Sequence, residues 1–466
     1  MKKGLFSSYI AGITDYTHGE SYGTIIRYFI PECITAFLLY SVPIWIESGF
    51  ISQLQSTPTY ATLGTTNNLI HFLVKFAEGF SVGTLVLAGQ FNGRHNYKEA
   101  GRSLRDAFFV TLFIGSIITG MLYFGAYWVY YWFGVPAEII SLGVPFLRTR
   151  AIGIFFMFIY FAFVGFLRGI KNTRVPMNIY IAGTFILLVI EYALIFGKFG
   201  FPEMGLQGAA IATVIQFAFM ATAAIVYVMR NKETAKYGVE LFSNLKSTSY
   251  IKEIFKLSWP VVLDKTALAA AYIWLLKLVA PMGTSIVATF CVVKDMERFA
   301  FAPAVAFASV ITFLVSNDYG RKNWDAIKSN LKKTIFLASF FVMCILVLFS
   351  AMPEVIIGLF DKKGEFIGLA ARAFPIVSMM AFFDLLQIVL CGALRGAANV
   401  KTVMMVRILV LSCFFVPASY FISLLPIQDN VTKLLLIYSS FYVGNAIMSF
   451  IYINRFRSDE WKKYSV

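Results

Sequence analysis

The chain has 466 residues, of which 59% are hydrophobic and only 14% charged, and its mean hydropathy is +0.73. Soluble domains carry about 25% charged residues, so this composition excludes an ordinary soluble fold. The formal net charge of +15 suits anionic lipid headgroups at a membrane surface, and we do not expect a nucleic acid polymer as a partner. The composition therefore predicts an all-α membrane protein.

Apolar runs of about 20 residues, enough for a helix to cross a hydrocarbon core of about 30 Å, recur along the chain. The first six predicted spans lie near 24–51, 62–91, 107–134, 143–167, 174–198 and 205–229. The second six lie near 254–280, 285–316, 334–360, 367–392, 402–425 and 433–454. This pattern predicts an N-terminal lobe at 1–231, a cytoplasmic linker at 232–253 and a C-terminal lobe at 254–466.

Basic residues are concentrated in alternate loops and in both tails, whereas the loops at 48–61 and 133–142 contain no Lys or Arg. Cytoplasmic loops hold an excess of Lys and Arg, so both termini are predicted to be cytoplasmic and the protein to be a multi-pass protein of the inner membrane. The basic residues are Lys2, Lys3, Arg94, Lys98, Arg102, Arg105, Arg168, Lys171, Arg174, Arg230, Lys232, Lys236, Lys246, Lys252, Arg321, Lys322, Lys332, Lys333, Arg455, Arg457, Lys462 and Lys463.

Two halves of the chain match each other at an offset of 227 residues. The segment GFLRGIKNTRVPM at 165–177 aligns with GALRGAANVKTVM at 392–404, and Gly93-Arg94 aligns with Gly320-Arg321. This duplication predicts two lobes that insert the same way up, because each repeat has an even number of spans. Transporters of this build bind solute between their repeats near the middle of the membrane, then expose it to each side in turn.

The Gly-x-Leu-Arg-Gly segments are predicted to end spans 4 and 10 at the cytoplasmic face, where glycine permits a sharp turn. We assign their arginines, Arg168 and Arg395, a structural role, because each can lie at headgroup level or cap helix carbonyl groups.

Charged residues inside spans cost about 2.5 to 3.5 kcal/mol each on insertion scales, and they usually face a bundle interior or a water-filled cavity. Residues three or four apart share a helix face, so polar stripes on spans 2 and 8, with further charges on spans 7 and 8, predict a substrate-binding set. Its members are Asn67, His71, Lys75, Glu78, Lys265, Lys277, Lys294, Asp295 and Arg298. The alternative is that these charges pair with one another and hold the helices together.

Two carboxylates, Glu47 in span 1 and Glu191 in span 5, have no basic residue within one helical turn. Burial in an apolar medium disfavours the charged form of a carboxyl group, so such a group can load and release a proton. The alternative is a neutral carboxyl group that serves only packing.

Three segments resemble the multidrug and toxic compound extrusion (MATE) family, part of a wider flippase superfamily. They are LRGIKNTRVPM at 167–177, EYALIFGKFGFPEMGLQGAAIAT at 191–213 and FDLLQIVLCGALRG at 383–396. The resemblance covers almost the whole chain. It implies twelve helices in two six-helix lobes, monomeric action, and export of organic solutes in exchange for protons or sodium ions.

The resemblance also assigns coupling residues. Glu47 and Glu191 stand where the family has aspartates in its first and fifth spans, and Thr213 matches a threonine of the sixth span. Leu187 replaces an asparagine one turn before Glu191, which favours protons over sodium, because a hard cation needs several oxygen ligands. Asp384 resembles an acid of the tenth span in one family branch, and Asp264 aligns loosely with an acid of the seventh.

The function predicted is a secondary active antiporter of the multidrug-efflux type for small organic solutes, without a cofactor. The lysines of the polar stripes leave a second hypothesis open, a carrier or flippase for anions such as nucleotides, phosphorylated metabolites or lipid-linked phosphates. An enzyme is not expected, because the sequence has no zinc-binding His-Glu-x-x-His, nucleophile elbow or phosphate-binding glycine loop.

Overall fold

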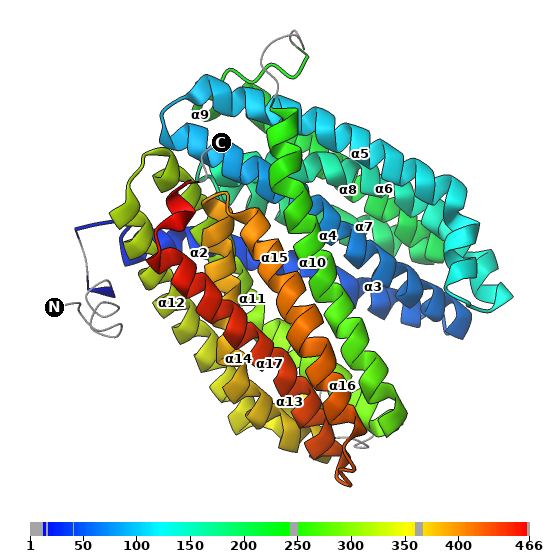
Figure 1. Ribbon diagram of the computed structural model, residues 1–466. Coiled ribbons are helices and arrows are strands. Elements are labelled where there is room, and N and C mark those ends of the chain that lie inside the picture. Colours follow the sequence, from blue (N-terminus) through cyan, green and yellow to red (C-terminus); the bar gives the residue numbers. More distant parts are fainter. Residues whose placement is uncertain (1–12, 15–16, 41, 243–249, 359–366, 464–466) are drawn as a thin grey trace. The chain divides into compact units, whose positions relative to one another are not determined.

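The computed structural model describes residues 13–14, 17–40, 42–242, 250–358 and 367–463, and within these ranges the chain forms helices and turns without a strand (Figure 1). Some predictions fall outside the described residues. They are the basic residues Lys2, Lys3 and Lys246, the middle of the predicted linker, and the last two residues of the span predicted at 334–360.

In the described part of the chain, ten helical segments are long and apolar enough to cross a membrane. They are α4 (Thr57–Gly93), α5 (Tyr97–Trp132), α6 (Ala137–Gly169), α7 (Arg174–Phe196), α8 (Leu206–Arg230), α11 (Thr284–Gly320), α12 (Trp324–Ala351), α14 (Ile367–Gly396), the continuous run of α15 (Val400–Val410), the π-helical turn η2 (Leu411–Phe415) and α16 (Val416–Leu424), and α17 (Asn430–Arg457).

The two remaining predicted spans are helical as well, although neither is among these ten segments. The first consists of α2 (Tyr22–Tyr40) and α3 (Val42–Ser52), and the seventh is α10 (Ile251–Val279). Short helical segments fill some connections: α9 (Lys232–Ala235), η1 (Ala280–Met282), α13 (Pro353–Gly358) and η3 (Glu460–Lys463). The prediction of an all-α membrane protein with twelve spans is therefore confirmed.

The chain divides into two compact units. Unit N comprises Ile34–Val262, and unit C comprises Met1–Cys33 together with Leu263–Val466. The boundaries fall inside α2 and α10, so the two helices that begin the sequence repeats each contribute to both units. The predicted lobes at 1–231 and 254–466 follow the chain order instead, and their boundaries remain a prediction.

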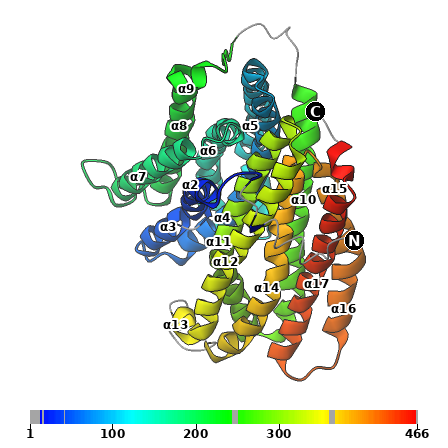
Figure 2. The ribbon, with the colours of Figure 1, turned by 90° about the vertical axis from the view of Figure 1, so that its left-hand side faces the viewer.

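Each unit is organised around one central helix. In unit N, α6 packs against α4, α5 and α8 (Figure 2). In unit C, α14 packs against α11, α12 and α17. Because α6 and α14 occupy equivalent places in the sequence repeats, both units have the same core arrangement.

The turns repeat as well as the helices. His95 and Lys322 both have positive φ angles, 60° and 58°, in the turns that follow α4 and α11. Lys171 and Ala398, in the turns that follow α6 and α14, have φ angles of 63° and 60°. Left-handed backbone is uncommon for residues other than glycine, and each pair is separated by the repeat offset of 227 residues. Unusual geometry at matching positions supports the duplication.

The glycines of the Gly-x-Leu-Arg-Gly segments have a different role from the predicted one. Gly165 and Gly169 lie within α6, where a Cβ atom would approach the carbonyl oxygens of Ser81 and Leu85 on α4 to 2.3 and 2.8 Å. The equivalent glycines of α14 lie as close to the backbone of α11. Small residues four apart let two helices approach closely in a membrane. These glycines serve helix packing and not a sharp turn.

We expect Gly165→Ala to lower the free energy of unfolding by about 1 to 3 kcal/mol, the range for overpacking a tight contact. Gly125→Ala on α5 is the matched control, because its added Cβ would meet no atom within 4 Å. Thermal unfolding of the purified protein in detergent measures both changes. Equal midpoints for the two variants would contradict the assignment of Gly165 to the α4–α6 contact.

Aromatic side chains fix the segment that follows each repeat. In unit N, Tyr237 is 2% exposed and its ring centroid lies 5.5 Å from that of Tyr97. In unit C, Trp461 is fully buried and lies 5.5 Å from Trp324, which aligns with Tyr97 at the repeat offset. The first part of the predicted linker is therefore packed onto unit N in the same way that the C-terminal tail is packed onto unit C.

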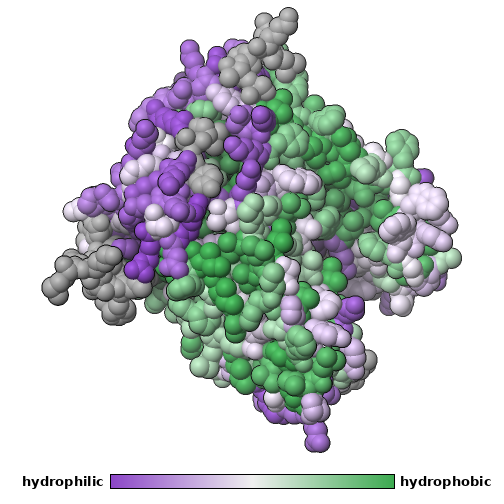
Figure 3. Space-filling model, in the orientation of Figure 1, coloured by the Kyte–Doolittle hydropathy of each residue, from purple (hydrophilic) through white to green (hydrophobic). Residues whose placement is uncertain are grey.

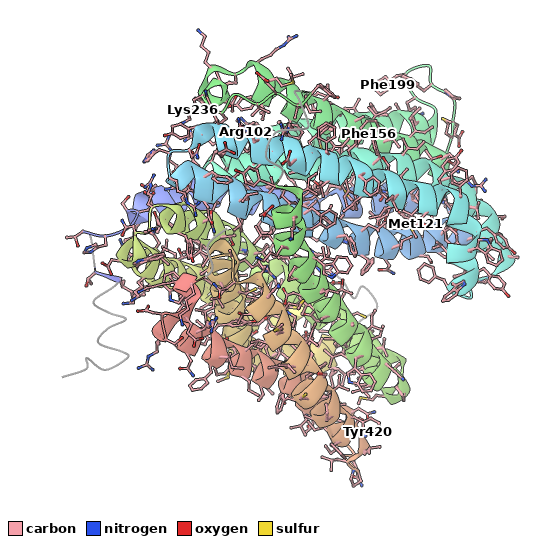
Figure 4. All side chains as sticks on the ribbon, turned by 45° about the horizontal axis from the view of Figure 1, so that its top comes forward. Arg102, Met121, Phe156, Phe199, Lys236 and Tyr420 are labelled. Carbon is pink, nitrogen blue, oxygen red and sulfur yellow. The ribbon has the colours of Figure 1, made fainter. Side chains whose placement is uncertain are left out.

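In each unit, polar residues gather at one end (Figure 3 and Figure 4). Figure 4 shows Arg102 and Lys236 at one end of unit N and Phe199, in the α7–α8 loop, at the opposite end. In unit C, hydrophilic residues gather over the α11–α12 turn, whereas hydrophobic residues follow the lengths of the helices (Figure 3). Exposed tyrosines and tryptophans such as Trp128 and Trp132 lie at the far end of α5, as is typical of a membrane interface.

Candidate functional site

Five polar side chains of unit N, hereafter the Arg150 cluster, come together from five helices. The Nη2 atom of Arg150 on α6 lies 2.8 Å from Oε1 of Glu47 on α3. The guanidinium also donates to Oδ1 of Asn67 on α4 at 2.7 Å and to Oγ1 of Thr213 on α8 at 3.2 Å. Glu191 on α7 completes the cluster, with Glu47 and Arg150 as the charged groups that act on its carboxyl group.

The local structure explains why Arg150 is held in one place. Its side chain is only 7% exposed, and the guanidinium carbon lies 5.1 Å from the centroid of the Phe146 ring, one turn earlier on α6. The Nδ2 atom of Asn67 donates to Oε2 of Glu47 at 3.3 Å, which leaves its Oδ1 atom to accept from Arg150. Each polar group thus orients the next.

Glu191 differs from the other members of the cluster. It is completely buried, and neither oxygen of its carboxyl group has a hydrogen-bond partner among the described residues. The helix α7 that carries it packs against α8 and α3, and Leu187, also buried, lies one turn before it. Glu47 has the Arg150 guanidinium as a counter-ion. Glu191 is therefore the carboxyl group of the cluster whose charge is left without a direct partner.

The sequence predicted four members of this cluster. Glu47, Glu191 and Thr213 were expected to couple an ion, and Asn67 to contact substrate; the structure brings all four together around Arg150. The arginine itself was missed, although it lies inside the span predicted at 143–167. A search of that span for charged residues, the same test that found Glu47 and Glu191, would have found it.

The rest of the polar stripe on α4 lies farther along the helix. Lys75 forms an ion pair with Glu78, with 3.6 Å between Nζ and Oε2. His71 is half-buried between this pair and Asn67. The pairing of Lys75 with Glu78 favours the structural alternative for these two residues, and their predicted contact with substrate remains a prediction.

In unit C, Asp264 is bound by two arginines. Its carboxylate, 1% exposed, accepts hydrogen bonds from Arg395 of α14 and Arg407 of α15. Arg395 belongs to the second Gly-x-Leu-Arg-Gly segment; this ion pair favours a structural role for it, and that role remains a prediction. An acid held by two guanidinium groups is poorly placed to exchange a proton, and the geometry favours a structural role for Asp264 over the predicted coupling role.

A second group of acids in unit C lies against α17. Glu297, 6% exposed, accepts hydrogen bonds from the hydroxyl groups of Tyr438 and Tyr442. Asp384 accepts a hydrogen bond of 3.0 Å from Nδ2 of Asn445. Asp384 was a predicted coupling residue, whereas Glu297 was not in the predicted site. Tyr438 and Tyr442, at i and i+4 on the last span, share one helix face, so a common acceptor on a neighbouring helix was the signal available in the sequence.

The remaining predicted substrate contacts of unit C are spread over α10 and α11. The ammonium group of Lys294 lies 4.8 Å from the centroid of the Tyr272 ring, and that of Lys277 lies 5.5 Å from the Trp274 ring. Asp295 and Arg298 are exposed and form an ion pair, with 3.6 Å between Oδ1 and Nη1. Lys265 is half-buried. Lys294, Asp295 and Arg298 are close together on α11 and act on one another by their charges, whereas Lys265 and Lys277 belong to α10.

The repeat offset relates the two polar stripes. Asn67 and His71 of α4 align with Lys294 and Arg298 of α11. The cluster itself is not repeated, because the positions of Arg150 and Glu191 are taken by Val377 and Ala418 in the second repeat. Among the described residues, no group of His, Cys, Asp and Glu side chains could hold a metal ion.

Comparisons with known proteins agree on one family. A profile of the MatE family matches residues 32–193 and 260–421, once in each half of the chain. A probable multidrug resistance protein NorM of Thermotoga maritima is 25% identical over 337 residues, 72% of each chain. A second such protein, from Synechocystis, is 24% identical over 396 residues, which are 83% of this chain and 84% of that one.

The fold matches solved structures of the same kind. The Vibrio cholerae MATE transporter VcmN superposes with a TM-score of 0.85 at 16% sequence identity, covering 98% of this chain and all of that one. At this level of identity the likeness concerns the fold alone.

Proposed function

Because the chain belongs to the MatE family, we propose that it is a secondary antiporter that exports small organic solutes of the multidrug type. The relatives named as multidrug resistance proteins support this choice of substrate class. Each unit has its own packed core, as alternating access between two repeats requires. The proposal includes an inner-membrane location with cytoplasmic termini, and action as a monomer among membrane lipids.

We further propose that the coupling ion is a proton carried by Glu191. The supporting observation is that its carboxyl group is completely buried and has no hydrogen-bond partner among the described residues. Burial favours the neutral form of such a group. Glu47 and Arg150 carry opposite charges, so the Arg150 cluster is neutral when Glu191 is protonated and carries one negative charge when it is not.

This difference in charge accounts for an antiport in which a proton moves inward and the organic solute moves outward. An organic cation is attracted to unit N when Glu191 is deprotonated, and it loses that attraction when a proton arrives from the outside. Because each ligand weakens the binding of the other, the two are coupled. A proton gradient then drives the solute outward without any covalent chemistry.

Exchange in proteoliposomes tests this function. The protein is reconstituted with a labelled lipophilic cation, and movement is followed under an imposed proton gradient, an imposed sodium gradient, or neither. We expect movement of the cation under the proton gradient alone. Movement of a labelled nucleotide in place of the cation would contradict the substrate class, and movement driven by sodium would contradict the coupling ion.

The second hypothesis, a carrier of anions, rested on the lysines of the polar stripes. Several of these groups have partners: Lys75 has Glu78, Arg298 has Asp295, and Lys294 lies over an aromatic ring. The relatives named as multidrug resistance proteins do not favour an anionic substrate either. A cationic or neutral solute is therefore the better choice.

We expect Lys294→Met to leave export of a lipophilic cation at least as fast as in the unmodified protein, because it removes a positive charge from a predicted substrate contact. Lys401→Met, at an exposed position of α15, is the control for a general loss of charge. Initial rates of cation export in proteoliposomes give the comparison. A loss of cation export confined to Lys294→Met, with folded protein, would contradict this expectation and would show that export of the cation needs the Lys294 ammonium group.

A further inference from the structure

Arg150 binds the oxygen atoms that a coupling ion would need. Its guanidinium lies 2.8 Å from Oε1 of Glu47, 2.7 Å from Oδ1 of Asn67 and 3.2 Å from Oγ1 of Thr213. The hydroxyl group of Thr213 donates its own proton to the carbonyl oxygen of Ala209 at 3.0 Å, so its oxygen faces Arg150 as an acceptor. A carboxylate, an amide carbonyl and a hydroxyl group thus converge on one positive charge.

These three kinds of oxygen are the ligands that hard cations prefer. An arginine side chain has five N–H donors, no acceptor, and a charge that it does not lose in proteins. It therefore uses the lone pairs that a metal ion would use and adds no ligand of its own. The ring of Phe146 and the burial of the side chain hold the guanidinium in this position.

We propose that Arg150 is a tethered cation that stands in place of a sodium ion in unit N, and that its removal opens a latent sodium site made by Glu47, Asn67 and Thr213. The inference rests on the proposed antiport and deepens it, because it names the residue that restricts coupling to protons. The charge of Glu47 is balanced by the guanidinium of Arg150 throughout the cycle. Glu191 is therefore the member of the cluster that changes its charge.

The electrostatic effect is large enough to decide between the ions. Two unit charges about 4 Å apart at an effective dielectric constant of about 20 repel each other enough to weaken binding roughly a thousandfold. A sodium ion beside Arg150 would meet this repulsion and would also find three of its oxygen ligands occupied. A proton on Glu191 needs no oxygen ligand from the other members of the cluster.

Sodium binding by the purified full-length protein tests this inference without any transport. Thermal unfolding midpoints are measured in NaCl and in KCl at equal ionic strength, for the unmodified protein, Arg150→Asn and Arg150→Lys. We expect a sodium-specific rise of the midpoint for Arg150→Asn, saturating with concentration, and none for the other two. Arg150→Lys is the matched control because it keeps the positive charge. Adding Glu47→Gln to Arg150→Asn should abolish the rise, because it removes the charged ligand.

The following results decide whether Arg150 stands in place of a sodium ion. A sodium-specific rise in the unmodified protein, or none in folded Arg150→Asn, would overturn the inference. Recovery of Arg150→Asn from membranes only in the presence of sodium would support it. If neither salt yields folded Arg150→Asn, Arg150→Ser is measured in its place under the same two criteria. A failed proton-driven exchange in proteoliposomes would instead overturn the proposed antiport, and it would leave the sodium result unchanged.

Discussion

Glu191→Gln is expected to abolish export driven by a proton gradient, reducing it to the level of liposomes without protein. Glutamine has nearly the same shape as a protonated glutamate, but it cannot release a proton. The Arg150 cluster would therefore stay neutral throughout the cycle and would never attract the solute by its charge. The measurement is the initial rate of labelled cation export under an imposed proton gradient, with sodium absent on both sides.

Two charged groups act on Glu191 from the elements packed against α7, and they define the controls. They are Glu47 of α3 and Arg150 of α6. Glu203→Gln, at an exposed position between α7 and α8, removes a carboxylate outside this group and should leave export unchanged. Proton-driven export by Glu191→Gln at the rate of the unmodified protein would exclude Glu191 as the coupling residue.

Asp264→Asn is expected to destabilise the protein by about 3 to 5 kcal/mol, the effect of removing one partner of a buried ion pair. The substitution leaves the guanidinium groups of Arg395 and Arg407 facing a neutral amide in the interior of unit C. The expected result is a lower yield of folded protein and a lower thermal midpoint in detergent. Adding Arg407→Met should recover part of the loss, because it removes one of the two unpaired charges.

Asp384→Asn provides the comparison within the same unit, since Asp384 accepts from the neutral side chain of Asn445. We expect it to leave the midpoint within about 1.5 kcal/mol of the unmodified protein, as for the loss of one ordinary hydrogen bond. Asp264→Asn with a normal midpoint but no export would show that Asp264 belongs to the transport machinery and not to the structure.

The helices were predictable because the bilayer imposes a length and a polarity on every span. Over their described residues, all twelve predicted segments coincide with helices. The repeat was equally visible, because identical residues at one offset mark positions where both halves need the same geometry. Gly165 and Gly392 are examples, and each lies against the backbone of a neighbouring helix.

Contacts between distant residues could not be predicted in the same way. Asp264 is 131 and 143 residues away from the arginines that bind it, and no local pattern indicates such a pairing. Arg150 could be found by a search of its span for charged residues, but its partners on four other helices could not. The role of a charge depends on which helices pack together, and hydropathy does not contain that information.

The duplication also had a limit as a guide to function. At the offset of 227 residues, Arg150 aligns with Val377 and Glu191 aligns with Ala418. Both halves keep the glycines and turns that build the fold, but the second repeat has neither the arginine nor the glutamate at the positions that match Arg150 and Glu191. The proposed coupling site therefore lies where the two halves differ and not where they are identical.

Proton release on substrate binding tests the central claim most directly. A lipophilic cation is added to the purified protein in weakly buffered, sodium-free solution, and the pH is followed with an indicator dye. The account predicts that the unmodified protein releases protons as the cation binds, and that Glu191→Gln binds without releasing them. Binding by the unmodified protein with no change in pH, or equal release from Glu191→Gln, would contradict it.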